Sequence, residues 1–188
     1  DDGESDAAIV AYNKALEIDE RSAKALVGIG NIEHRRGNDK EAWDAFEKSI
    51  EYDPIAFEAW YNLGVVAESM GNSNKAFSYY TKALELQEEH VLTLVNVGNL
   101  LMRDKQFDKS AEFYKKAIAI ARDDFKANYN LGLLKLATKD YAGAQSFFEI
   151  ACRSEPSEMI AWNQYIRASM QLQDFANALH ACDVVLSV

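Results

Sequence analysis

The sequence predicts an all-α protein built as a solenoid of antiparallel helix hairpins. Three observations support this class. Apolar residues recur at helical spacing along the chain. The same residue types return every 34 positions. Short boundaries rich in Gly, Asn and Asp separate the helical stretches, and no alternating pattern typical of strands occurs. With 188 residues, 48% of them hydrophobic, the chain can bury a sizeable core.

Four columns of residues share the 34-residue register. The first holds Gly30, Gly64, Gly98 and Gly132. The second holds the small residues Ala42, Ala76, Ser110, Ala144 and Ala178. The third holds Phe46, Tyr80, Tyr114, Phe148 and Cys182. The fourth holds Ala15, Ser49, Ala83, Ala117, Ala151 and Val185. A period of this length indicates a repeat architecture in which each unit covers its neighbour.

Residues 6–18 open the chain as a lone second helix, and five hairpins follow. Apolar stripes predict their first helices at 23–36, 57–70, 91–104, 125–137 and 159–172. Their second helices are expected at 39–52, 73–86, 107–120, 141–154 and 175–188. In the second hairpin Gly71 can end one helix in a left-handed turn, and Asn72 can cap the next. Pro54 and Pro156 stand where a unit ends.

The predicted organisation is a single array. It has a half repeat at 6–22 and full repeats at 23–56, 57–90, 91–124 and 125–158, followed by a truncated repeat at 159–188. A single hairpin cannot bury its own apolar stripe, so adjacent repeats are expected to stack.

This pattern resembles the tetratricopeptide repeat (TPR). The second repeat carries its motif as Trp60, Leu63, Gly64, Ala76, Tyr80 and Ala83. Local departures are Leu26, Leu94 and Asn128 in place of Trp, and Lys105, Lys139 and Gln173 in place of the Gly between helices. The last repeat has Tyr165 and Ile166 where Leu-Gly is expected, which puts its packing in question. The resemblance implies a right-handed superhelix whose first helices line a concave groove.

That resemblance implies a peptide-binding groove formed by the side of each first helix that lies opposite its core stripe. The residues expected there are Asn31, Tyr61, Asn62, Val65, Leu92, Val95, Asn96, Asn99, Met102, Lys126, Tyr129, Asn130, Leu133 and Gln164.

One column of this groove, Asn62, Asn96 and Asn130, can hold a peptide backbone, because a side-chain amide both donates and accepts hydrogen bonds. Such a ladder resembles the groove of the O-linked N-acetylglucosamine transferases. The alternative is a consensus residue that faces water. The apolar residues around the ladder suit a hydrophobic partner segment, extended or helical. Alternatively, some of them contact the opposite wall or a neighbouring unit.

One mode of the resembled family is not expected. Its two-carboxylate clamp uses Lys, Asn, Asn, Lys and Arg over three repeats. The corresponding residues here are Val27, Asn31, Asn62, Leu92 and Asn96, so the asparagines match and the cations are missing.

Composition argues against several other functions. A net charge of −10 disfavours nucleic acid and anionic membrane surfaces as partners. No stretch approaches the roughly 20 apolar residues of a membrane span, and no secretion signal is visible. The two cysteines, Cys152 and Cys182, are expected as buried thiols in a reducing, cytoplasmic compartment. The histidines lie in different repeats without metal-like spacing, so neither a metal, a cofactor nor a catalytic set is expected.

Three functional interpretations stay open. The first is a non-catalytic scaffold or adaptor that binds a peptide or helical segment of a partner within a multiprotein complex. The second is the substrate-presenting arm of an enzyme, such as a glycosyltransferase, whose catalytic domain is absent. The third is a structural subunit that self-associates through its terminal repeats, because the terminal helix, "ACDVVLSV", is apolar and lacks a polar cap.

Overall fold

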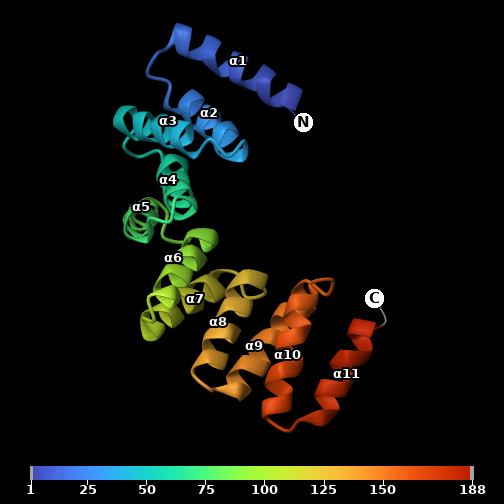
Figure 1. The fold of residues 1–188 in the computed structure, drawn as a ribbon. Coiled ribbons are helices and arrows are strands. Elements are labelled where there is room, and N and C mark those ends of the chain that lie inside the picture. Colours follow the sequence, from blue (N-terminus) through green and yellow to red (C-terminus); the bar gives the residue numbers. More distant parts are fainter. Residues whose placement is uncertain (1, 187–188) are drawn as a thin grey trace. The chain divides into compact units, whose positions relative to one another are not determined.

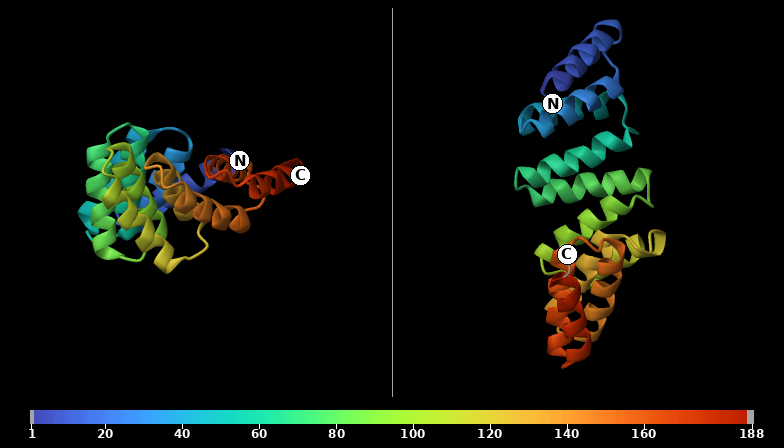
Figure 2. Two further views of the ribbon diagram at one scale, coloured as in Figure 1. Left: turned by 90° about the horizontal axis from the view of Figure 1, so that it is seen from below. Right: turned by 90° about the vertical axis from the view of Figure 1, so that its right-hand side faces the viewer.

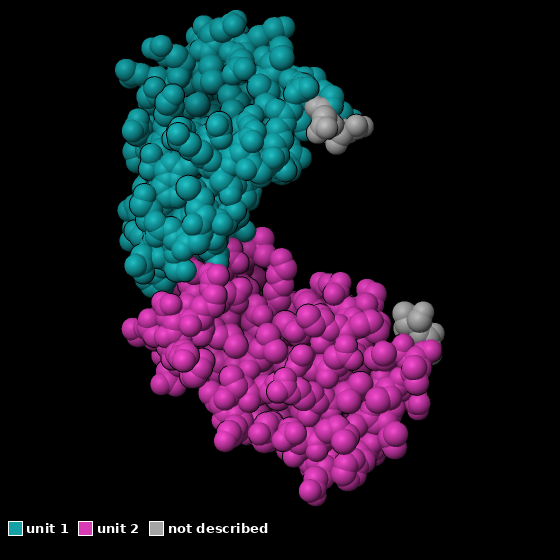
Figure 3. Space-filling view, in the orientation of Figure 1, with its two compact units in different colours: residues 1–88 teal, residues 89–188 magenta. Residues whose placement is uncertain are grey.

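A computed structural model describes residues 2–186 of the chain. The described residues form eleven α-helices and contain no strand, which confirms the all-α class. The helices group into two compact units, residues 1–88 and 89–188 (Figure 3). Each unit has its own packed helices and is described by itself. No described helix combines the length and apolar character needed to cross a membrane.

Unit 1 contains two complete hairpins and one further helix (Figure 1). Its helices are α1 (Asp2–Ile18), α2 (Ala23–Arg35), α3 (Asp39–Tyr52), α4 (Phe57–Ser69) and α5 (Ser73–Leu86). Helices α2 and α3 form the first hairpin, α4 and α5 form the second, and α3 packs against α4. Helix α1 packs against α2, as expected for the second helix of a half repeat.

Unit 2 contains three hairpins (Figures 1 and 2). Its helices are α6 (Val91–Arg103), α7 (Phe107–Ile120), α8 (Phe125–Ala137), α9 (Tyr141–Ser154), α10 (Met159–Gln171) and α11 (Phe175–Leu186). The hairpins α6/α7, α8/α9 and α10/α11 stack through contacts of α7 with α8 and of α9 with α10.

The bounds of the ten hairpin helices agree with the predicted bounds to within one residue wherever the structure describes them. Helix α1 begins earlier than predicted, at Asp2. The predicted end of the last helix, residues 187–188, lies outside the described residues. The division into one continuous array of repeats stays a prediction.

All five hairpins turn in the same way. The N–H of the residue before each second helix donates to a carbonyl five residues earlier, as Asn72 does to Ala67 (2.8 Å) and Asp140 does to Lys135 (2.9 Å). This Schellman geometry needs a left-handed residue just before it. Gly71 supplies that residue with φ +75° in the second hairpin, but Lys139 takes it with φ +64° in the fourth. Replacing Gly at this place therefore leaves the turn intact.

The glycine column lies against the aromatic column of the same hairpin. A Cβ added to Gly132 would lie 2.7 Å from a ring carbon of Phe148, and one added to Gly64 would lie 2.4 Å from Tyr80. Both rings are fully buried. The two helices of a hairpin can approach this closely only because glycine has no side chain at the crossing.

Helix α1 has no preceding first helix among the described residues, so the ring of its Tyr12 packs against the helix that follows it. Tyr12 occupies the aromatic column, one period before Phe46. Its ring lies over Gly28 of α2, where an added Cβ would come within 2.3 Å of the ring. Gly28 holds the position that Asn or Gln takes in the later repeats. The glycine therefore makes room for the ring of the half repeat.

One of the three departures at the Trp position, Asn128, preserves a hydrogen bond. Trp60 Nε1 donates to the carbonyl of Pro54 (2.8 Å), and Trp162 Nε1 donates to that of Pro156 (3.0 Å). Asn128, at the same position in the fourth repeat, donates through Nδ2 to Arg122 O, 2.9 Å away. The amide thus reproduces the polar contact of the indole while giving up its apolar area.

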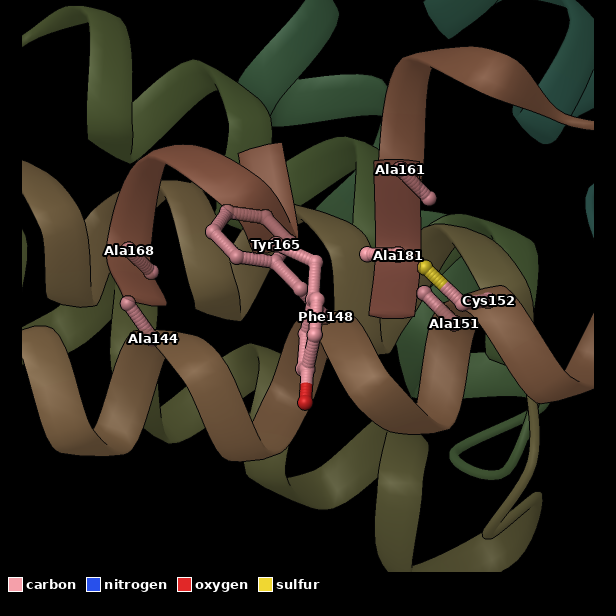
Figure 4. Close-up of a cluster of buried hydrophobic side chains, with 8 residues drawn as sticks. All are labelled: Ala144, Phe148, Ala151, Cys152, Ala161, Tyr165, Ala168 and Ala181. Carbon is pink, nitrogen blue, oxygen red and sulfur yellow. The ribbon is translucent and has the colours of Figure 1, made fainter. Parts of the chain in front are cut away.

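The last repeat is well packed despite its unusual residues. Tyr165 is buried and joins Phe148 in a cluster with alanines of α9, α10 and α11 (Figure 4). Ile166 packs against this cluster from its edge. Cys152 is buried in the same cluster, and burial raises the pKa of its thiol to about 12. Cys182 is only half-buried, so the prediction that both thiols are buried is wrong for Cys182.

Candidate peptide-binding faces

The predicted site residues all lie on the first helices of the hairpins. In unit 1 they are Asn31 on α2, and Tyr61, Asn62 and Val65 on α4. We call these four residues the first-helix face of unit 1. The remaining ten predicted residues lie on α6, α8 and α10, and form the first-helix face of unit 2.

In unit 1 the two asparagines are joined across the repeat boundary. Asn62 Nδ2 donates to Asn31 Oδ1 over 2.7 Å. Asn31 is exposed and Asn62 is half-buried. The bond fixes the orientation of both amides, so the donors that it does not use point in defined directions.

The same arrangement recurs in unit 2. Asn130 Nδ2 donates to Asn99 Oδ1 over 2.9 Å. The hydroxyl of Tyr114 donates to the same oxygen over 2.7 Å. Burial raises the pKa of Tyr114 to about 12, so the phenol stays protonated as a donor. Asn99 Oδ1 therefore accepts two bonds, and its Nδ2 is the group left for a ligand.

These bonds add partners that the predicted ladder did not include. The ladder consists of Asn62, Asn96 and Asn130, at one position of successive first helices, each as a contact for a peptide backbone. The observed bonds link that position to an asparagine 31 residues earlier in the preceding repeat. Tyr114 was assigned only to the core, because the aromatic column shows where the ring lies but not what its hydroxyl reaches. A continuous ladder through Asn96 stays a prediction.

Each face also carries a stacked aromatic pair. Phe57 and Tyr61 have ring centroids 6.2 Å apart with an interplanar angle of 12°. Phe125 and Tyr129 are closer, at 5.6 Å and 7°. All four side chains are half-buried. Neither phenylalanine is among the predicted site residues, although a Phe four residues before each Tyr on a helix predicts such contact.

Aromatic packing holds the unit 2 pair in place. The ring of Tyr129 lies 5.8 Å from that of Phe148, which is fully buried in the hairpin core. Burial also raises the pKa of the Tyr129 phenol. The pair therefore presents a flat, preformed apolar surface beside Asn130 rather than two mobile rings.

The apolar residues of the two faces are not equally accessible. Leu92 is 40% exposed, and Val65, Met102 and Leu133 are half-buried. Val95 is only 1% exposed, so its prediction as a lining residue is wrong. Position 95 borders the core stripe of α6, and the short side chain of valine there is buried among its neighbours. Tyr129, at the same position one repeat later, reaches the surface because its ring is longer.

The two polar residues at the edges of the unit 2 face behave differently. Lys126 is exposed on the first turn of α8. Gln164 is half-buried, and its Oε1 is buried without a hydrogen-bond partner among the described residues. The residue 31 positions earlier is Leu133, not Asn, so the pairing seen at Asn130 is not available to Gln164. Only the amide nitrogen of Gln164 is a candidate contact for a ligand.

Both faces offer amide donors, aromatic rings and aliphatic side chains. Among the side chains described, no three His, Cys, Asp or Glu residues lie together in a way that could hold a metal ion. Two cavities in the protein lie elsewhere. One, of about 280 Å³, is lined in part by Trp43 and Lys75, and the other, of about 420 Å³, is lined in part by Arg122 and Arg153.

Comparisons with known proteins agree with this architecture. Family models described as tetratricopeptide repeat match residues 1–51, 55–123 and 129–187. No curated protein sequence matches the chain.

Several solved structures are similar to the chain. The crystal structure of YrrB, described as a TPR protein with an unusual peptide-binding site, is 26% identical with a TM-score of 0.71, over 86% of this chain and 83% of that one. PilF of Pseudomonas aeruginosa is 23% identical with a TM-score of 0.78, over 90% and 77%. PilW, a type IV pilus biogenesis factor, is 16% identical with a TM-score of 0.81, over 95% and 83%. The last two show the fold alone. By its sequence models, its helix hairpins and its glycine and aromatic columns, this chain belongs to the tetratricopeptide repeat family.

Proposed function

We propose that this protein is a non-catalytic interaction scaffold whose first-helix faces hold a peptide or helical segment of a partner protein. The observation that carries the proposal is the pair of asparagine bonds, Asn62 to Asn31 and Asn130 to Asn99. Each bond fixes two amides that are not fully buried in the hairpin core.

The fixed amides suit a polypeptide backbone. The Nδ2 groups of Asn31 and Asn99 donate no hydrogen bond among the described residues and can reach a peptide carbonyl. Because the bonds to Asn62 and Asn130 already orient them, little conformational entropy is lost when a ligand binds. Backbone recognition of this kind depends little on ligand sequence.

The neighbouring apolar groups supply selectivity. In unit 2 the stacked rings of Phe125 and Tyr129 lie on the same helix as Leu133, and Met102 lies on the adjacent first helix α6. All four are half-buried, so a partner side chain can remove further apolar area from water. We infer a partner segment that combines an accessible backbone with aliphatic or aromatic side chains.

The comparison with YrrB supports peptide binding as the kind of function proposed for this chain. That protein is described as having a peptide-binding site, and it shares the fold with this chain at 26% identity. The net charge of −10 supports a protein partner over nucleic acid. The proposal places the chain in a cytoplasmic multiprotein complex, which native mass spectrometry of affinity-purified complexes would test.

The experiment is a titration with a peptide selected against the protein by phage display. Replacing Asn31 and Asn99 with Ala removes the proposed donors and is expected to weaken binding by about 1 kcal/mol for each hydrogen bond that the ligand makes with them. Asn177 is the matched control, because it lies on α11, a second helix, and its Nδ2 bonds to Asp174. An unchanged affinity in the double variant, with Asn177→Ala also neutral, would reject the proposal.

A second candidate function, self-association, rests on the outer stripe of α11. Phe175, Leu179 and Leu186 are 55%, 66% and 83% exposed. In the first repeat, the positions of Leu179 and Leu186 are taken by Trp43 and Ile50, which pack in a cluster with residues of α4. We infer that a further helix covers the stripe on α11, and a helix of a second copy of the chain is the candidate that can be tested with this protein alone.

Light scattering at increasing protein concentration tests this contact. The wild-type chain is expected to form dimers or longer assemblies that Leu179→Glu returns to monomer, because a buried unpaired charge opposes association. Light scattering that shows only monomer at high protein concentration would count against self-association.

A further inference from the structure

Unit 1 has a cavity of about 280 Å³ that the proposed function does not use. It is lined by Lys40 and Trp43 of α3, by Met70 and Asn72 in the α4–α5 turn, and by Lys75 of α5. None of the four residues of the first-helix face lines it. It therefore lies at the edge of the stacked hairpins, where the start of one second helix meets the turn of the next repeat.

The indole of Trp43 lines the cavity and is held by its neighbours. Trp43 meets Tyr79 edge to face, with centroids 5.4 Å apart and an angle of 72°. Lys75 Nζ lies 4.5 Å from the centroid of the indole, a cation–π contact. The contact holds one ammonium group of the cavity lining over the aromatic surface.

Within the part of the chain that the structure describes, no carboxylate pairs with the cations of this cavity. No carboxylate lines it. None of the ion pairs among residues 2–186 includes Lys40 or Lys75. Asp39, the neighbour of Lys40, bonds instead to His34 and Ser69, and the Ser69 hydroxyl is the main reason that the pKa of this carboxyl lies below its usual value.

This concentration of positive charge is not a general feature of the repeats. The five lining positions carry a formal charge of +2. At the corresponding positions 34 residues later, Asp104 and Lys109 give a formal charge of 0. At those 68 residues later, Asp108 and Asp140 give −2, and at those 102 residues later, Asp174 gives −1. In the last of these, Gln145 replaces Trp43 and donates to both Ser169 and Asp174. The repeat architecture therefore does not require the Lys–Trp–Lys arrangement.

We propose that this cavity binds an acidic side chain of a partner peptide, with its oxyanion between Lys40 and Lys75 and its stem against Trp43. Two unpaired ammonium groups match a carboxylate or a phosphate. An indole surface accepts the aliphatic stem of either kind of side chain. In a protein with a net charge of −10, such a site selects its ligand through local charge.

Nuclear magnetic resonance of the three tryptophan indoles tests the site. The Trp162 indole N–H bonds to Pro156 in unit 2 and serves as an internal reference. The probes are three capped tripeptides, Gly-Glu-Gly, Gly-phosphoserine-Gly and the neutral Gly-Gln-Gly, together with inorganic phosphate, all at one ionic strength. The acidic peptides are expected to shift the Trp43 signal, and the Gln peptide is expected to leave it in place.

Variants link the shift to the lysines. The double variant Lys40→Met with Lys75→Met is expected to weaken binding of the acidic peptides by about tenfold or more, since charge-assisted hydrogen bonds are lost. Lys109→Met is the matched control, because Lys109 holds the position of Lys75 one repeat later.

Three results would overturn the proposal. The first is an equal shift with the Gln peptide, and the second is unchanged binding in the double variant. The third is inorganic phosphate binding as tightly as the phosphoserine peptide, which would exclude a peptide as the source of the anion. An unshifted Trp60 indole signal in the double variant shows that unit 1 remains folded, because the Trp60 indole N–H bonds to Pro54 in that unit.

Discussion

At the scale of single residues, three hairpin turns place a side chain where glycine is preferred. Lys105, Lys139 and Gln173 have φ of 59°, 64° and 59°. The left-handed conformation costs a residue with a Cβ about 1–2 kcal/mol relative to glycine. Gly37 and Gly71 take the same conformation in the first two turns. Turn geometry, not side-chain contact, is therefore conserved between the five hairpins of this chain.

Replacing Lys139 with Gly is expected to stabilise unit 2. Relief of the left-handed strain exceeds the added entropy of the unfolded chain, for a net gain of about 0.5–1 kcal/mol. Urea denaturation followed by circular dichroism measures the change. Lys115→Gly, in the interior of α7, is the control and should lose about 1 kcal/mol. A loss of stability at Lys139 as well would show that the lysine makes a contact that outweighs the strain.

One histidine makes the fold sensitive to pH. His90 caps α6: its Nδ1 lies 3.3 Å from the backbone N–H of Thr93, from which it accepts, and 2.7 Å from Thr93 Oγ1. Burial lowers the pKa of His90 below its ordinary value of 6.5. The neutral ring is therefore favoured in the folded state, because a protonated Nδ1 can no longer accept the capping bond.

The sign of the pH effect follows from this lowered pKa. The stabilising contribution of neutral His90 is present above pH 6.5 and is lost as the pH falls through the folded pKa. The wild-type chain should therefore lose more stability than His90→Asn between pH 7.5 and the folded pKa, since Asn caps without titrating. Parallel denaturation curves across this pH range measure the difference, and equal losses in the two proteins would remove His90 as the cause.

The placement of residues on the helices was predicted correctly where it follows from the repeat position alone. Asn31, Asn62, Asn99 and Asn130 could be placed on the first helices from the 34-residue register. The burial of Val95 could not, because it depends on side-chain length at the edge of the core stripe. Nor could the bond from Tyr114 to Asn99, which depends on how far the phenol extends beyond the hairpin core.

At the scale of helices, the glycine and aromatic columns determine how each hairpin closes. The sequence period identified both columns and all ten hairpin helices, because each repeat has the same packing requirement and the signal recurs. It raised doubt about the last repeat, yet that repeat packs. In that repeat, Ile166 of α10 replaces glycine and Cys182 of α11 replaces the aromatic residue. The larger of the two side chains therefore lies on the first helix of the hairpin instead of the second.

The fourth hairpin offers a direct test of close helix approach. In Gly132→Ala the new methyl would lie 2.7 Å from the buried Phe148 ring, so the helices must separate. The expected loss of stability is about 1–3 kcal/mol, the range for overpacked cores. The double variant with Phe148→Leu should lose less than the sum of the two single changes, because the smaller side chain makes room. Additive losses would indicate that the methyl and the ring do not meet.

Gly3→Ala is the control for propensity in this test. Gly3 lies in α1, and nothing is within 4 Å of the Cβ that alanine would add. Its change should be neutral or stabilising by up to about 1 kcal/mol, since alanine is the better helix former. A loss of stability at Gly3 equal to that at Gly132 would contradict the steric explanation.

At the scale of the whole molecule, each unit carries its own copy of the recognition chemistry. Unit 1 has the bond from Asn62 to Asn31 beside the Phe57–Tyr61 stack, and unit 2 has the bond from Asn130 to Asn99 beside the Phe125–Tyr129 stack. The two sets are separated by 68 residues, or two repeats. The sequence could predict the family and the faces because both follow the period. It could not predict the charged cavity at Trp43, because the Lys–Trp–Lys arrangement that lines it does not recur at the equivalent positions of the later repeats.

The most direct test of the central claim is to observe the asparagine side chains while a selected peptide is bound. In side-chain amide spectra of the labelled protein, the signals of Asn31 and Asn62, or of Asn99 and Asn130, are expected to shift. The signal of Asn177, at the start of α11, is expected to stay in place. Saturating binding that leaves the first two pairs unmoved and shifts only signals of the second helices would contradict the account.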